Sequence, residues 1–196
     1  SARLIGGRLA MQLGAPKLGR QLHLLAWRHA PAHLEAIYYQ ARYLLERFGP
    51  VSAWRFARRH PDWSDASPEL QADWWSLLGF LAGRFRDWER AERLFQKAEN
   101  LAPDHPWTFV ERAGVYEMAE KYEQGLEAAQ RALELRPWYR PAVQAAAHLL
   151  FRLGRSQAAL ELLYEGMEHL ECGLLAAQAA VIHYEQEQYT EGLAAL

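Results

Sequence analysis

The fold is decided by residues 72–105, which read ADWWSLLGFLAGRFRDWERAERLFQKAENLAPDH. Two small residues in this stretch, Gly79 and Ala91, stand twelve positions apart among large apolar residues. Because antiparallel helices approach closely only where small side chains face each other, the pair predicts the crossing point of a helical hairpin. Pro103 ends the second helix, since proline lacks an N–H and its ring clashes with the preceding turn.

The same pair of small residues recurs along the whole chain. The pairs are Gly7 with Gly19, Ala41 with Ala53, Gly79 with Ala91, Ala113 with Gly125, Ala147 with Ala159, and Ala180 with Gly192. Their first members are offset by 34, 38, 34, 34 and 33 residues. Such a period is typical of a repeat protein in which each helical hairpin stacks on the next.

The 72–105 unit resembles the tetratricopeptide repeat, a helix–turn–helix unit of about 34 residues. The resemblance rests on Trp75, Leu78, Gly79, Trp88, Ala91, Phe95, Ala98 and Pro103, and the next unit repeats the plan with Phe109, Tyr116, Tyr122, Gly125, Ala132 and Pro137. It implies an all-α fold, a right-handed superhelical solenoid of antiparallel helix pairs. It also places Trp75 and Trp88 in the core, and leaves Trp74, Trp107 and Trp138 at a repeat junction or on the surface.

We expect one solenoid of about five full repeats and a truncated sixth. The units are 1–33, 34–71, 72–105, 106–139, 140–172 and 173–196. His60 and Pro61 are expected to stop the second helix of the second unit early, with an exposed loop over 61–68. Because the sequence stops at Leu196 inside a helix, and terminal repeats need a polar cap, we expect the chain to be a piece of a longer protein.

Charge is distributed unevenly along the chain, although the net charge is only −2. Residues 1–60 hold ten Lys or Arg against two acidic residues, whereas residues 156–196 hold seven glutamates and no Lys or Arg. The molecule is therefore expected to be electrically polar from one end to the other.

The sequence offers no chemistry for a membrane span, a metal site or catalysis. No run approaches the roughly 20 apolar residues that a spanning helix needs. Pro31 separates His29 from His33, and His169 with Cys172 has no second pair of ligands, so no metal or other cofactor is expected. A phosphate loop, a nucleophile elbow and a triad spacing are all missing, and we predict that this segment is not an enzyme.

The compartment is predicted only coarsely. Cys172 is the single cysteine, so no internal disulfide can form, which fits a reducing cytoplasm. A signal peptide removed ahead of Ser1 is also compatible with the sequence.

The resemblance implies that the first helix of each hairpin lines a concave groove that binds a protein or peptide. The second, fifth, ninth, twelfth and thirteenth positions of the repeat usually face that groove. In this sequence they give Tyr38, Arg42, Asp73, Phe80, Arg84, Trp107, Val110, Glu117, Gln144, His148, Phe151 and Arg152, with Arg8, Glu35, Tyr184 and Glu185 toward the ends. Arginine and exposed aromatic residues dominate binding energy, which favours Arg42, Phe80, Arg84, Trp107 and Phe151. The alternative is that Phe80 and Phe151 only pack between repeats.

Other functions stay open beside peptide binding. The oppositely charged ends could make a homo-oligomer, or the repeats could recognise substrate for an enzyme domain elsewhere in the parent protein. The basic first third could bind RNA through arginines interleaved with aromatic rings, namely Arg20, Arg28, Arg42, Arg47, Arg55, Arg58 and Arg59 with Tyr38, Tyr39, Tyr43 and Trp54. The overall pI near 6.4 argues against nucleic acid.

Overall fold

The computed structural model describes residues 1–60, 62–170 and 173–196 of the chain. It is 79% helical, and these residues contain no strand. The all-α prediction is therefore confirmed. Helix packing divides the chain into two compact units, residues 1–103 and residues 104–196.

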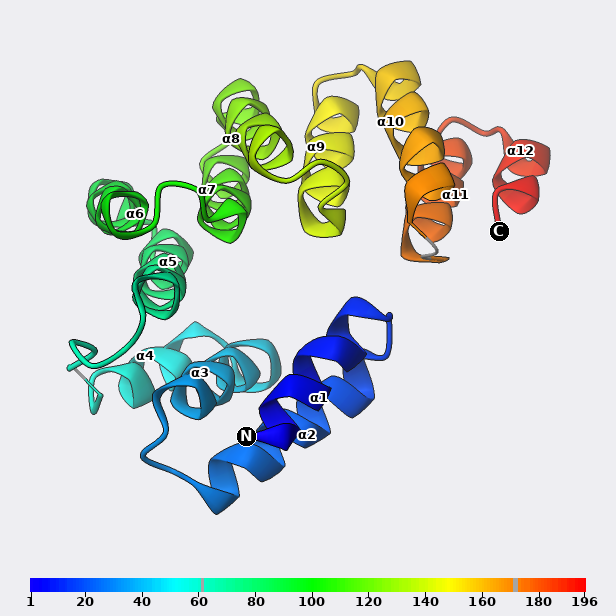
Figure 1. Ribbon diagram of the computed structural model, residues 1–196. Coiled ribbons are helices and arrows are strands. Elements are labelled where there is room, and N and C mark those ends of the chain that lie inside the picture. The colour runs from blue at the N-terminus through cyan, green and yellow to red at the C-terminus, as the bar shows by residue number, and fades with distance from the viewer. Residues whose placement is uncertain (61, 171–172) are drawn as a thin grey trace. The chain divides into compact units, whose positions relative to one another are not determined.

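The first unit consists of three helical hairpins (Figure 1). Its helices are α1 (Ala2–Gln12), α2 (Pro16–His29), α3 (Leu34–Phe48), α4 (Pro50–Ala57), α5 (Pro68–Arg84) and α6 (Trp88–Leu101). Successive hairpins stack, because α2 packs on α3, and both α3 and α4 pack on α5. Side-chain caps begin two of the helices: Ser67 Oγ accepts from Leu70 N at 3.3 Å, and Asp87 Oδ1 accepts from Arg90 N at 3.2 Å.

The second unit repeats this plan with two complete hairpins and a shorter last one (Figure 1). Its helices are α7 (Pro106–Met118), α8 (Tyr122–Leu135), α9 (Arg140–Arg152), α10 (Ser156–His169), α11 (Gly173–Glu185) and α12 (Tyr189–Ala194). The first helices of successive hairpins pack on each other, α7 on α9 and α9 on α11. The first helices of the second unit therefore lie side by side in the order α7, α9, α11.

The paired small residues lie where the two helices of a hairpin cross. A Cβ added at Gly125 would lie 3.2 Å from the Ala113 carbonyl oxygen, and one added at Gly192 would lie 3.3 Å from that of Ala180. These contacts are close for any Cβ, so the crossing predicted from the repeat is present in both hairpins. In the hairpin of α5 and α6 the space beside Gly79 is filled differently, by the ring of Phe95 at 3.1 Å.

The turn inside five of the hairpins has a constant form. Each contains one residue in the left-handed region, and these residues are Gly14, Arg86, Glu120, Gly154 and Glu187, with φ of 76°, 60°, 60°, 75° and 61°. The next residue then donates its N–H to a carbonyl five positions back, as Lys121 does to Tyr116 at 2.9 Å. Such bonds satisfy carbonyl groups left free at the end of the first helix.

The connection between α4 and α5 is exposed at Asp62, Ser64, Asp65 and Ser67, as predicted, and departs from that prediction at Trp63. Helix α4 does end early, at Ala57, but Trp63 is only 3% exposed. Its ring stacks on that of Trp74 with 4.0 Å between centroids, and its Nε1 donates to the His60 carbonyl at 2.9 Å. Both indoles belong to the core of the first unit. An indole buries a large apolar area, so the pair contributes strongly to that core. The described residues do not include Pro61, Glu171 and Cys172. The predicted stop at Pro61 and the predicted end of the fifth repeat at Cys172 therefore lie outside the described residues.

Candidate functional site

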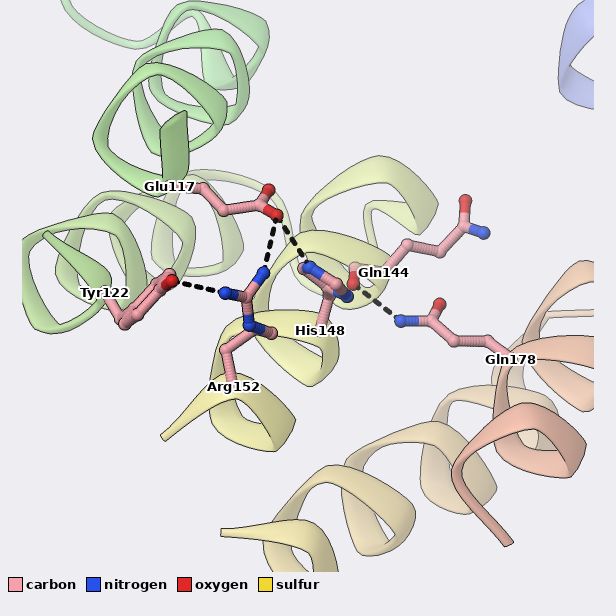
Figure 2. A network of polar contacts seen from close by, with 6 residues as sticks. All are labelled: Glu117, Tyr122, Gln144, His148, Arg152 and Gln178. Carbon is pink, nitrogen blue, oxygen red and sulfur yellow. Dashed lines mark hydrogen bonds and ion pairs between the residues drawn. The ribbon is translucent and has the colours of Figure 1, made fainter. Parts of the chain in front are cut away.

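The first helices of the second unit carry a row of polar side chains that are bonded in two groups. Gln144, His148 and Arg152 are spaced four residues apart on α9, so they lie along one face of that helix. Glu117, near the end of α7, reaches this face from the preceding hairpin, and Gln178 on α11 reaches it from the following one (Figure 2).

Glu117 is the centre of the charged half of this row. His148 Nε2 donates to Glu117 Oε1 at 2.8 Å, and the same oxygen lies 3.8 Å from Nη1 of Arg152 (Figure 2). Arg152 also donates from Nη2 to the Tyr122 hydroxyl and lies over the Tyr122 ring, with Cζ 4.6 Å from its centroid. The guanidinium is thus held between an acid on α7 and a phenol at the start of α8.

The other half of the row carries amides. Gln178 Nε2 donates to the backbone carbonyl of Gln144 at 2.9 Å, although α9 and α11 are separated by a whole helix in the sequence (Figure 2). Arg140 Nη1 donates to Gln144 Oε1 at 3.2 Å. We call the row formed by Glu117, Gln144, His148, Arg152 and Gln178 the polar row. It crosses α7, α9 and α11, and its charged members keep a third or more of their side chains exposed.

Comparison of structures identifies this arrangement of hairpins. The chain is similar to TTC0263, a thermophilic TPR protein of Thermus thermophilus, with 21% identity, coverage of 92% of this chain and 97% of that one, and a TM-score of 0.65. The chain has a tetratricopeptide-type repeat fold. A crystal structure of MamA is also similar, with 14% identity, 83% and 92% coverage and a TM-score of 0.50. Comparison of sequences alone finds no matching family model and no matching curated protein.

In the second unit, the residues at the repeat positions predicted to face a groove divide into polar and apolar ones. Glu117, Gln144, His148 and Arg152 come together in the polar row. Phe151 packs against the core cluster around Val143 and Leu163, and Val110 packs against Phe109 and Ala132. Trp107 is half-buried at the start of α7. For Phe151 the structure therefore favours packing between repeats.

In the first unit, the residues predicted to face a groove do not form a comparable row. Tyr38 is 5% exposed and belongs to the core, so it presents no surface to a partner. Arg42 and Asp73 are partly exposed and engaged in interactions within the protein. Phe80 is half-buried, and Arg84 is exposed in the last turn of α5. The residues nearer the ends also differ: Arg8 Nη1 lies 2.7 Å from Glu35 Oε1, whereas Tyr184 and Glu185 are exposed.

Two members of the site were missed by the repeat register. Gln178 follows Gln144 by 34 residues, the period of the repeat, but the register used for the last unit starts one residue too early to include it. A strict period of 34 from Gln144 would have found it. Tyr122 is the first residue of α8, the second helix of its hairpin. Nothing in the sequence indicates that its hydroxyl contacts Arg152 on α9.

The rings proposed for RNA stacking are occupied inside the protein. Tyr38 is buried, and Tyr39 stacks on His23 with 3.6 Å between ring centroids. Trp54 carries the guanidinium of Arg90 on its face, with Cζ 4.7 Å from the ring centroid. An RNA base needs a free ring face to stack on, so stacking on Tyr39 or Trp54 would have to displace these contacts.

The remaining sequence expectations concern metals and membranes. Over residues 1–60, 62–170 and 173–196, no three His, Cys, Asp or Glu side chains gather as metal ligands would. His169 stacks on Trp138 at 4.3 Å, and Cys172 lies outside the described residues. In that same part of the chain, every helix is too short or too polar to span a bilayer.

Proposed function

We propose that this chain is a non-catalytic protein-interaction module that binds an extended protein segment along the first helices of its hairpins. The observation that supports this most is the polar row, which continues from α7 through α9 to α11. A peptide lying across these helices would meet polar groups from three successive repeats. The similarity to solved tetratricopeptide-type structures supports the fold on which the proposal depends.

The amide half of the row suits recognition of a peptide backbone. A glutamine side chain has two N–H donors and one acceptor oxygen, and so matches a peptide group in both roles. Gln144 and Gln178 use one group each in the bonds described above, and both side chains remain partly exposed. Binding through main-chain groups would make the segment's extended conformation matter more than its individual side chains.

The charged half would select the side chains that lie nearby. Arg152 uses one of its five N–H donors on Tyr122, forms an ion pair with Glu117 and stays exposed. Because these contacts hold the guanidinium in place, an incoming carboxylate would pair with it at a small loss of side-chain entropy. We therefore propose that the segment carries an acidic residue opposite α9.

The first unit would add a separate contact at the end of α5. Arg84 is exposed there, in the last turn of the helix, one turn after the half-buried Phe80. An exposed arginine next to aromatic surface is a common source of binding energy. We propose this contact for the first unit by itself.

Selection of peptides on the purified 196-residue chain tests the proposal. Peptides from a random display library would be selected and their Kd measured by fluorescence anisotropy. Gln144→Ala combined with Gln178→Ala should raise Kd at least about tenfold, because each change removes a central hydrogen-bonding group. Arg152→Ala should weaken acidic peptides more than neutral ones.

A matched control uses glutamines on the second helices of the same unit. Gln130 on α8 and Gln157 on α10 are exposed and lie outside the polar row. Changing both to Ala should leave Kd unchanged. Equal loss of affinity in the two double variants, or selection of no binding peptide at all, would remove the proposal.

A further inference from the structure

We infer that this chain binds the surface of an anionic lipid bilayer through a basic and apolar face of its second and third hairpins. The face consists of Phe48, Val51, Arg55, Arg58, Phe85 and Arg86, and we call it the α4 face. It lies within the first unit, away from both ends of the sequence, and it shares no residue with the polar row. The inference therefore adds a second binding surface to the peptide surface proposed above.

Helix α4 has one side in the protein core and the other side in water. Ala53 and Ala57 are buried in the core cluster of the first unit, whereas Val51, Arg55 and Arg58 are exposed. Because these three exposed residues follow one another at spacings of four and three, they form one stripe along the helix. The buried alanines hold the helix in place, so the protein presents this stripe on a fixed support.

The apolar part of the α4 face lies at two hairpin turns. Phe48 ends α3 and is 59% exposed, and Val51 in the first turn of α4 is 49% exposed. Phe85 follows α5 and is 43% exposed. Its ring contacts Trp54 on α4, with 6.2 Å between centroids. The α5–α6 turn thus lies beside α4, and large apolar side chains from both hairpins are exposed there.

The basic part of the α4 face has no acidic groups to balance it. Residues 47–60 contain four arginines and no acidic residue. In the part of the chain that the structure describes, the guanidinium groups of Arg55, Arg58 and Arg86 have no hydrogen bond or ion pair. Arg155, an exposed arginine in the second unit, instead pairs with a glutamate on α8 at 2.6 Å. The positive charge of the α4 face is therefore available to an external anion.

This combination of charge and apolar surface matches an anionic bilayer. The guanidinium group pairs with phosphate through two hydrogen bonds, and each basic residue close to an anionic membrane strengthens binding about fivefold. Apolar side chains beside the arginines enter the boundary between headgroups and acyl chains, which is fluid and needs no matching cavity. Phe48 and Val51 are placed for this entry because they project from a turn.

A nucleic acid would use only part of the α4 face. Its phosphates would pair with the same arginines, but its bases need ring faces to stack on. Val51 has no ring, and the Phe48 ring already contacts Tyr43, with 6.1 Å between centroids, and Arg47, whose Cζ is 6.0 Å from the Phe48 centroid. Insertion into lipid uses the aliphatic and aromatic members alike, which favours the bilayer.

Sedimentation with lipid vesicles tests the inference on the whole 196-residue chain. Mixed vesicles of phosphatidylcholine and phosphatidylglycerol supply an anionic surface, and vesicles of phosphatidylcholine alone are neutral. The chain should bind the neutral vesicles at least about tenfold more weakly than the mixed ones. The triple variant Arg55→Ala, Arg58→Ala and Arg86→Ala should lose at least about tenfold in affinity for the mixed vesicles.

A matched control removes the same charge elsewhere. Arg93→Ala, Arg131→Ala and Arg155→Ala change three exposed arginines that form ion pairs outside the α4 face. This control variant should keep nearly the full affinity for mixed vesicles, because attraction to the membrane acts only over a short distance from the charge. Gln144→Ala with Gln178→Ala should also leave vesicle binding unchanged.

A fluorescent label reports whether the apolar part enters the lipid. Cys172 is the single cysteine, so Val51→Cys in a Cys172→Ser chain offers one thiol for the dye NBD. The dye emission should rise and shift to shorter wavelength on mixed vesicles, because the dye moves from water into an apolar medium. The same dye at Val181→Cys, a site on α11 that is 57% exposed, should not respond.

Three results would overturn the inference. The first is a chain that leaves mixed vesicles unbound at low salt, including one that binds single-stranded RNA through the same arginines. The second is an equal loss of vesicle binding in the two triple variants, with both folded by circular dichroism. The third is vesicle binding during which the dye at position 51 does not respond.

Discussion

Glu117 Oε1 accepts a hydrogen bond from His148 Nε2 at 2.8 Å, and this bond joins two residues 31 positions apart on successive first helices. The same carboxylate oxygen lies 3.8 Å from Arg152 Nη1. Position in the repeat predicted each of these three residues as facing a partner, and the structure adds that they hold one another. A surface whose side chains are already fixed loses less entropy when a ligand binds.

The Glu117 and His148 pair should contribute little to folding. Both side chains are more than a third exposed, and exposed pairs are typically worth about 0.2–1 kcal/mol. A double-mutant cycle with Glu117→Ala and His148→Ala, followed by denaturant unfolding, should give a coupling free energy in that range. A coupling well above it would mean that the pair belongs to the core and is not a recognition surface.

Substitution at Gly79 should overpack the α5 and α6 hairpin. A Cβ there would lie 3.1 Å from the Phe95 ring, which is itself buried. Gly79→Leu should therefore lower the free energy of unfolding by roughly 1–3 kcal/mol or more. Gly173→Leu is the control, since a Cβ at Gly173 meets nothing within 4 Å. An unchanged unfolding midpoint for Gly79→Leu would show that this crossing has room to spare.

Substitutions at two equivalent turn positions, Glu120 and Gly154, should have opposite effects on stability. Glu120 and Gly154 both have a positive φ, a conformation that costs roughly 1–2 kcal/mol for residues with a Cβ. Glu120→Gly should leave stability unchanged or raise it, whereas Gly154→Ala should lower the unfolding free energy by about 1 kcal/mol. Thermal unfolding of the two variants checks the pair. Equal losses in both would contradict the left-handed assignment.

Stability should fall in mild acid because of His23. The ring stacks on Tyr39, and burial lowers the pKa of His23 to about 4, with the nearby Arg8 charge acting in the same direction. In the unfolded chain an ordinary histidine binds a proton below about 6.5. The unfolded state therefore holds more protons between these values, so stability is complete above pH 6.5 and declines as pH falls toward 4.

Replacement of His23 by a ring that does not titrate isolates this effect. His23→Phe can keep the stacking on Tyr39 and should remove roughly 2–3 kcal/mol of the stability loss between pH 7 and pH 4.5. Urea unfolding of both proteins at the two pH values provides the comparison. The same pH dependence in both would exclude His23 as its source.

The sequence was sufficient for the hairpins because their determinants are local and periodic. Small residues at each crossing and prolines near helix starts repeat with the unit, so the helix order could be derived without a structure. The short α4 could be read from its early stop. The left-handed turns at Arg86, Glu120 and Glu187 could not, because their side chains carry no signal for a positive φ.

Contacts that leave the repeat pattern were not predictable. Trp74 has no obvious core position in the repeat, yet it stacks on Trp63 from the α4–α5 connection, and a connection has no period to reveal its packing. Tyr38 falls on a groove position but is buried, because it belongs to a core cluster that α4, α5 and their connection also form. The polar row was found in part: repeat position gave four of its members, and an offset of one residue in the last unit hid Gln178.

The central claim, that a protein segment lies across α7, α9 and α11, is tested most directly by NMR titration with a peptide selected on the chain. Side-chain amide signals of Gln144 and Gln178, and backbone amide signals around Glu117, His148 and Arg152, should shift most and saturate together. Signals of Gln130 on α8 and Gln157 on α10 should stay in place. Shifts concentrated on α8 and α10, with the polar row unaffected at saturation, would contradict the account.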